Sequence, residues 1–218
     1  MNTITSAKKL RNFPGTFSLK PRTYGTSCRG MTLLEALIAI SIFTMTMLAI
    51  ISSIQYFYRT NTYAIEQASA VSSAQRGVED IVKTVREAAY ASNGAYPIVS
   101  LGANDLTFYA DVDSDPYIER VRYYVSGASL YRAVTDPSGD PPTYGTASTT
   151  SLISETVRNV DQNVATFQYY DMNGVLMTNY ADIADVRFVS MNIVVNVDPN
   201  RLPNQLILRS TAAMRNLK

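Results

Sequence analysis

Residues 29–38 read RGMTLLEALI, and this stretch decides the fold because it opens a long apolar segment with a single acidic residue near its start. From Ala36 to Tyr58 no residue carries a charge. A helix of about 23 residues, rising 1.5 Å per residue, crosses a hydrocarbon core of roughly 30 Å. The segment therefore predicts a transmembrane helix over about residues 34–58. An acid at the edge of such a span is costly without a partner, which makes Glu35 a candidate functional residue.

Charge is divided unevenly along the 218 residues. Residues 1–30 contain six bases and no acid, whereas the rest of the chain has 13 bases and 18 acids, a net charge of −5. This fits a basic leader kept in the cytoplasm and an exported main body, because positive flanks stay inside. It argues against nucleic acid as a direct partner of the main body, since a phosphate-binding domain should be basic.

Histidine is absent and Cys28 is the one cysteine. A Ser-His or Cys-His catalytic pair therefore cannot be built, and the usual zinc sites lose their commonest ligand. A disulfide within the chain is excluded as well. The composition favours a protein that is not an enzyme, has no cofactor, and holds its exported part together by an apolar core.

The helix is expected to continue past the membrane and to cover residues 31–92. Apolar residues between Val71 and Ala89 recur at steps of three and four, with charged residues mostly between them, which indicates an amphipathic helix with one face to bury. Residues 92–97, SNGAYP, are predicted to end it.

After Pro97 the apolar period falls to two, as in strands. We expect strands at 105–110, 117–125, 130–134, 164–171, 189–197 and 205–214. Residues 135–150 are expected to form a long loop, and residues 152–160 either a short helix or a strand. One long helix followed by a run of strands predicts an α+β fold, with an antiparallel β-sheet head over residues 93–218 packed on the helix.

An acidic turn follows the first of these strands. Asp111, Asp113 and Asp115, with Glu119 after them, place oxygens at alternate positions, as at the start of a calcium loop. Pro116 stands where an EF-hand needs its glycine, and acidic turns also serve plain solubility. Calcium at the three aspartates and an unoccupied acidic turn are both consistent with this pattern.

The opening stretch resembles the N-terminus of type IV prepilins, the family of type IV pilins and of the pseudopilins of type II secretion and competence systems. The pattern of that family is a basic leader ending in glycine, a hydrophobic first mature residue, a threonine-containing step and a glutamate at the fifth mature position before an apolar helix. Gly30, Met31, Thr32 and Glu35 occupy those places.

The resemblance implies that prepilin peptidase cleaves between Gly30 and Met31 and methylates the new amino group of Met31. It also implies that Glu35, with Thr32 beside it, serves assembly by neutralising the amine of a neighbouring subunit. The implied partners are other pilin or pseudopilin subunits, the peptidase and the inner-membrane assembly platform. The implied location is the inner (cytoplasmic) membrane, crossed once, with the N-terminus in the cytoplasm before cleavage and the head in the periplasm or exterior.

Residues 164–176, 183–198 and 207–218 resemble, more loosely, the C-terminal domain of PilW-like minor pilins and of larger minor pseudopilins. Together with the missing cysteine pair, this favours a minor subunit at a priming or tip position of a type IV pilus or of a type II secretion-like pseudopilus. A major pilin is the alternative within the family. From another class, the chain could be an uncleaved signal-anchored protein with an exported enzymatic or receptor head.

Overall fold

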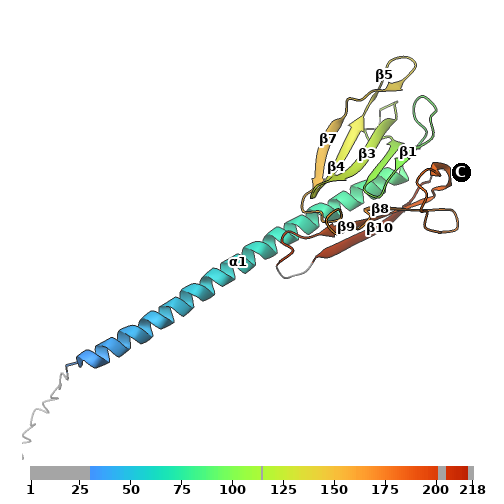
Figure 1. Cartoon of the computed structure of the whole chain (residues 1–218). Coiled ribbons are helices and arrows are strands. Elements are labelled where there is room, and N and C mark those ends of the chain that lie inside the picture. The colour runs from blue at the N-terminus through green and yellow to red at the C-terminus, as the bar shows by residue number, and fades with distance from the viewer. Residues whose placement is uncertain (1–29, 114, 201–204, 216–218) are drawn as a thin grey trace, which may run out of the picture. The chain divides into compact units, whose positions relative to one another are not determined.

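The computed structural model describes residues 30–113, 115–200 and 205–215 (Figure 1). The predicted leader lies outside these residues except for Gly30. The class is α+β, as predicted, with one long N-terminal helix followed by antiparallel strands. In chain order the elements are α1 (Leu33–Arg86), β1 (Ile98–Leu101), β2 (Asp105–Ala110), β3 (Glu119–Ser126), β4 (Ser129–Thr135), β5 (Pro137–Ser138), β6 (Thr143–Tyr144), β7 (Thr149–Ser154), β8 (Phe167–Tyr170), the 3-10 turn η1 (Ile183–Asp185), β9 (Phe188–Val195) and β10 (Leu206–Ala213).

The chain divides between Ile51 and Ser52 into two compact units. In the first unit, α1 is exposed along its length and apolar in composition. The second unit contains the rest of α1 and every strand of the described chain.

Helix α1 ends at Arg86, six residues before the predicted end at residue 92. The chain leaves the helix because it joins the sheet: Ala88 forms a bridge with Ala110, and the Ala89 N–H donates to the Tyr109 carbonyl at 3.0 Å. Gly94, expected near the helix end, instead closes a separate turn in which its N–H donates to the Ala91 carbonyl at 2.8 Å and its φ is 81°. A positive φ of this size favours glycine.

In the second unit, α1 presents buried side chains at helical spacing, as predicted from the apolar period. The apolar residues that are fully buried in α1 are Tyr63, Ala74, Val78, Ile81 and Val85. All of these except Tyr63 join a core with the inward side chains of the strands, the largest of which include Phe108, Tyr123, Phe167 and Tyr169.

The head is antiparallel, as predicted, but its strands form two main sheets instead of one. One sheet has five strands in the order β1-β2-β3-β4-β7, the other has three in the order β10-β9-β8, and β5 pairs with β6 in a small hairpin. Figure 1 shows the green end of α1 between the two larger sheets.

Two sheets are possible because α1 uses different positions around its circumference against each of them. Toward β9, the Gln67 amide donates to the Val195 carbonyl at 3.4 Å and accepts from the Val197 N–H at 3.0 Å. Toward the five-stranded sheet, Ser73 donates to the Ile153 carbonyl at 3.1 Å. A helix buried on more than one side can cover two sheet faces at once.

Two local expectations also need correction. Residues 135–150 do not form a plain loop, because they hold the β5–β6 hairpin and the start of β7. Residues 152–160 do not form one element, because β7 ends at Ser154 and the chain then crosses to the other sheet, where Val157 bridges to Val195. Strand β1 was not predicted, since only Ile98 of its four residues is buried and exposure does not alternate along it.

Candidate functional site

The first turn of α1 is built by Thr32 and Glu35. Thr32 stands directly before the helix, and its Oγ1 accepts from the Glu35 N–H at 3.3 Å while its carbonyl accepts from the Ala36 N–H at 3.1 Å. A helix leaves its first four N–H groups without partners, and a threonine side chain at this position satisfies one of them. Threonine followed three residues later by glutamate is the sequence of a capping box. The residues predicted to serve assembly therefore also define where the helix begins.

The predicted cleavage site lies immediately before this cap. Gly30 is exposed, and a Cβ added to it would meet no described atom within 4 Å. Met31 is 63% exposed. The backbone at 30–31 is thus open to an approaching enzyme.

The apolar part of α1 is exposed from residue 37 to residue 62. Three of its hydroxyls are satisfied by the helix itself, since Ser41 donates to the Leu37 carbonyl at 2.9 Å, and Thr44 and Thr46 each donate to the carbonyl four residues earlier at 2.7 Å. Such internal bonds remove the cost of placing hydroxyls in hydrocarbon. By length and composition the helix can cross a membrane.

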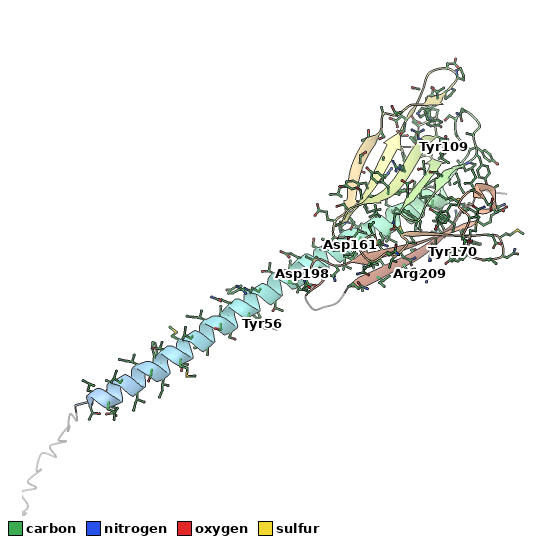
Figure 2. All side chains as sticks on the ribbon, viewed as in Figure 1. Tyr56, Tyr109, Asp161, Tyr170, Asp198 and Arg209 are labelled. Atoms are coloured by element: carbon green, nitrogen blue, oxygen red, sulfur yellow. The ribbon has the colours of Figure 1, made fainter. Side chains whose placement is uncertain are left out.

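The uncharged segment ends at an aromatic group followed by a cation. Tyr56, Phe57 and Tyr58 are exposed, and Arg59 comes next (Figure 2). Aromatic rings with a polar edge and a neighbouring base are typical of the boundary between hydrocarbon and water. This supports the predicted end of the span near residue 58.

Comparison with known proteins bears on this N-terminal segment directly. Residues 25–51 match the family model of the prokaryotic N-terminal methylation motif. This match supports the predicted resemblance of the N-terminal segment to type IV pilins and pseudopilins. The chain is also similar, with a TM-score of 0.44 and 10% identity, to a chain in the crystal structure of the GspK-GspI-GspJ complex from the enterotoxigenic Escherichia coli type 2 secretion system. The similarity covers 68% of the present chain and 99% of that chain. No curated protein matches the chain.

The acidic turn of the head is arranged differently from the prediction. The carboxylates of Asp111, Asp113 and Glu119 lie within 4.8 Å of one another. Asp115 is not in this group, and its carboxylate accepts from the Tyr117 N–H at 2.7 Å. Glu119 begins β3, and its position on the strand brings its side chain back beside the turn. The sequence pattern of alternating aspartates could not show that.

Glu119 is the buried member of the group, with 1% of its surface exposed. Its Oε2 accepts from the Val112 N–H at 2.9 Å. Burial raises the pKa of the Glu119 carboxyl, the Val112 hydrogen bond opposes this, and the negative charge of Asp113 adds to the increase. Three carboxylates at this spacing could hold a hard divalent cation, and calcium here stays a prediction.

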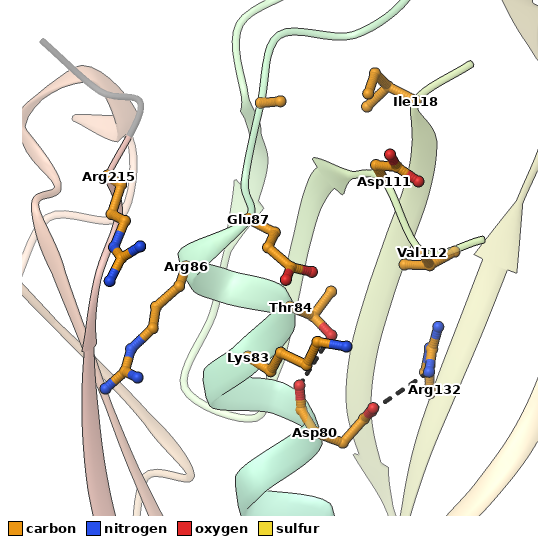
Figure 3. A pocket seen from close by; sticks show the side chains of 11 residues that line it. Asp80, Lys83, Thr84, Arg86, Glu87, Asp111, Val112, Ile118, Arg132 and Arg215 are labelled. Carbon is orange, nitrogen blue, oxygen red and sulfur yellow. Dashed lines mark hydrogen bonds and ion pairs between the residues drawn. The ribbon is translucent and has the colours of Figure 1, made fainter. Parts of the chain in front are cut away.

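A charged cleft of about 600 Å³ lies at the end of α1 (Figure 3). Asp80 and Arg132 form an ion pair at its base, with 3.4 Å between Oδ2 and Nη1. Lys83 of α1 and Glu87, directly after the helix, both direct their charged ends into the cleft. Bases and acids are mixed along its lining, so the cleft does not select a ligand by charge. The remaining lining residues are Thr84, Arg86, Ala89, Asp111, Val112, Ile118 and Arg215.

Proposed function

We propose that this chain is a minor pilin or pseudopilin, a structural subunit without enzymatic activity. In this proposal prepilin peptidase cleaves between Gly30 and Met31 and methylates the amine of Met31. The mature chain then assembles with other pilin or pseudopilin subunits, through the inner-membrane platform, into a type IV pilus or a type II secretion-like pseudopilus. Its place there would be at a priming or tip position.

One observation carries the proposal: the methylation motif stands at the start of an uninterrupted 54-residue helix whose apolar half is exposed. An exposed apolar helix is unstable in water and must be covered by lipid or by other helices. A membrane satisfies this need before assembly, and a bundle of like helices satisfies it in a filament.

Glu35 gains a partner in this proposal. Cleavage leaves a free amine at Met31, one helical turn from Glu35. Within one subunit the glutamate is favoured only by the helix dipole, by about 0.3–1 kcal/mol at an exposed site. A charge pair with the amine of a neighbouring subunit, excluded from water, would be stronger and would fix the axial register of the two helices.

The membrane topology follows from the charge distribution. The six bases of the leader would stay in the cytoplasm, and the head, with its net negative charge, would enter the periplasm or exterior. The membrane crossed is proposed to be the inner membrane.

The first experiment is the intact mass and N-terminal peptide of the protein from its native membrane, beside the variant Gly30→Val. A Cβ at position 30 would meet no described atom within 4 Å, so a lost cleavage in Gly30→Val reports on the peptidase and not on folding. Gly25→Val is the matched control, since it changes another glycine of the leader. A chain that begins at methylated Met31, and is lost only in Gly30→Val, supports the proposal.

Two results would contradict the proposed function and indicate another one. Residues 1–30 retained in the wild-type chain would indicate a signal-anchored protein with an exported enzymatic or receptor head. Cleaved chain present as the bulk of purified filaments would indicate a major pilin.

A further inference from the structure

The five-stranded sheet has an outer face, opposite α1, that carries a polar hollow of about 380 Å³. The strand register builds it, because Thr107 pairs with Arg122, Arg122 with Ala133, and Ala133 with Thr150 across four strands. Directly paired residues point to the same face of a sheet. Arg120 and Thr135 are a second such pair, next to the first row.

The floor of the hollow is made of short side chains. Thr107 and Ala133 are each 7% exposed and Thr135 is 6% exposed, yet all three line the hollow. Ala133 stands between the long side chain of Arg122 and Thr150, so its single methyl group leaves the depression open. The rim is formed by the sheet and by the segment that leads into β7.

The charged groups at the rim are held in place. Asp105 pairs with Arg122, with 2.5 Å between Oδ2 and Nη2, and the Arg122 guanidinium lies 4.7 Å from the centre of the Tyr124 ring. Arg120 donates to the Gly145 carbonyl at 2.6 Å, and no carboxylate of the described residues pairs with it. One positive charge at the hollow is therefore not neutralised.

Hydroxyl groups surround this charge and are available to a ligand. In the described part of the chain, the side-chain hydroxyls that line the hollow without a hydrogen-bond partner are those of Ser100, Thr135, Thr146, Ser148 and Thr150. Each can both donate and accept a hydrogen bond. A dense set of such groups beside a fixed carboxylate suits a ligand with many hydroxyls.

We propose that this hollow binds a saccharide that carries a carboxylate, such as a uronic acid unit of a polysaccharide. The carboxylate would pair with Arg120, and the sugar hydroxyls would bind the threonine and serine hydroxyls and Asp105. Arg120 suits this role because a guanidinium binds a carboxylate through two parallel hydrogen bonds. The activity goes beyond the proposed filament role, since it needs only the folded head.

Nucleic acid is the competing polyanion and fits less well. A strand of nucleic acid needs several cations along its backbone, and the hollow offers one that is not already paired. The net charge of −5 on the chain after residue 30 would also repel it. Nucleic acid therefore serves as a control ligand.

The test uses the full chain in a detergent that has no sugar headgroup, titrated with a short oligogalacturonate, with the same oligomer after reduction of its carboxyl groups, and with a DNA oligonucleotide of equal charge. We expect the acidic oligomer to bind at least about tenfold more tightly than the reduced one, as expected for loss of a charge-assisted bidentate contact. Arg120→Gln should remove that difference. Thr135→Val, which keeps the shape of the floor, should weaken both oligomers.

Arg209→Gln is the matched control, because it removes an exposed arginine from a strand of the other sheet. It should leave both affinities unchanged. No binding of either oligomer up to its solubility limit would overturn the proposal. So would equal weakening by Arg209→Gln, or binding of DNA as tight as that of the acidic oligomer, since both would indicate attraction without a site. None of these results depends on whether the chain is cleaved at Met31.

Discussion

Tyr123 on β3 donates its hydroxyl hydrogen to Asp80 on α1, with 2.9 Å between Oη and Oδ2. The tyrosine is fully buried, and its ring stacks on that of Phe108 with 6.1 Å between centroids. Arg132 on β4 reaches the same carboxylate, so two strands are joined to one helical residue. This bond fixes how the five-stranded sheet sits on α1.

Tyr123→Phe should therefore destabilise the head. It removes the hydroxyl and keeps the ring, so the loss reports on a buried hydrogen bond to a charged acceptor, which contributes about 1.5–3 kcal/mol. The free energy of unfolding can be measured by urea titration of the detergent-solubilised chain, followed by the near-ultraviolet circular dichroism of its tyrosines. Tyr131→Phe, at a partly exposed tyrosine of β4, is the control and should change the value by less than about 0.5 kcal/mol. If Tyr123→Phe lowers the free energy of unfolding no more than Tyr131→Phe does, the hydrogen bond makes no net contribution to stability.

Replacing Gly77 of α1 by alanine is expected to destabilise the head, although alanine usually stabilises a helix. Alanine in a helix is normally more stable than glycine by about 0.5–1 kcal/mol. Here a Cβ would collide with Ile153 Cγ2 of β7, and overpacking of this kind costs about 1–3 kcal/mol. Gly77→Ala should therefore lower the free energy of unfolding by about 1 kcal/mol.

The cause can be isolated with Ile153→Ala. In that background the obstructing methyl group is gone, so Gly77→Ala should become neutral or stabilising. Gln75→Ala, at an exposed position of the same helix, gives the effect of helix propensity alone. If Gly77→Ala destabilises equally in both backgrounds, the collision with Ile153 is not the reason.

The sequence predicts the elements of this fold better than their arrangement. Period three to four in α1 and period two in β2, β3, β4, β9 and β10 identify those elements, although α1, β2 and β9 bury more than one face. The split into two sheets depends on contacts such as Gln67 with Val195, which are 128 residues apart in the chain. Local periodicity carries no information about such a pair.

The candidate sites, too, can be predicted from the sequence only where their residues are close together in the chain. The motif from Gly30 to Glu35 is local, so it could be read from the sequence. Arg132 would be expected on a solvent face, but the register places it opposite Tyr123, where Asp80 meets it. The polar hollow requires four strands in register, and alternation within any one of them does not reveal it.

Glu119 should give the head a pH dependence between neutral and acidic conditions. Burial raises the pKa of its carboxyl above the ordinary value of 4.5. Below pH 4.5 the group is protonated in both the folded and the unfolded chain, and its contribution to stability is fully present. As the pH rises through the folded pKa, the unfolded state has already released its proton, so that contribution is lost.

Glu119→Gln keeps an oxygen for the Val112 N–H and cannot ionise. The variant should be more stable than the wild type at pH 7, and this advantage should disappear on acidification. Urea titrations at a series of pH values measure it, and Glu79→Gln, at an exposed glutamate of α1, is the control. Parallel titrations with calcium and with EGTA separate a bound cation from a buried acid, because a cation would stabilise the ionised wild type and remove the advantage of glutamine. If Glu119→Gln is more stable than the wild type by the same amount at every pH, ionisation of Glu119 is not the cause.

Glu35→Gln tests the assembly role without disturbing the start of the helix. The cap uses the Glu35 backbone N–H and the Thr32 hydroxyl, so glutamine preserves it. Loss of the side-chain charge costs the helix only about 0.3–1 kcal/mol, too little to melt a helix of this length. We expect a chain that is still cleaved at Met31 and anchored in the membrane but is absent from sheared filaments, as measured by intact mass and by quantitative immunoblotting. Glu66→Gln, at an exposed glutamate farther along α1, should be incorporated normally. Normal incorporation of Glu35→Gln would mean that the carboxylate pairs with no neighbouring amine, leaving Glu35 as a favourable charge at a helix N-terminus and nothing more.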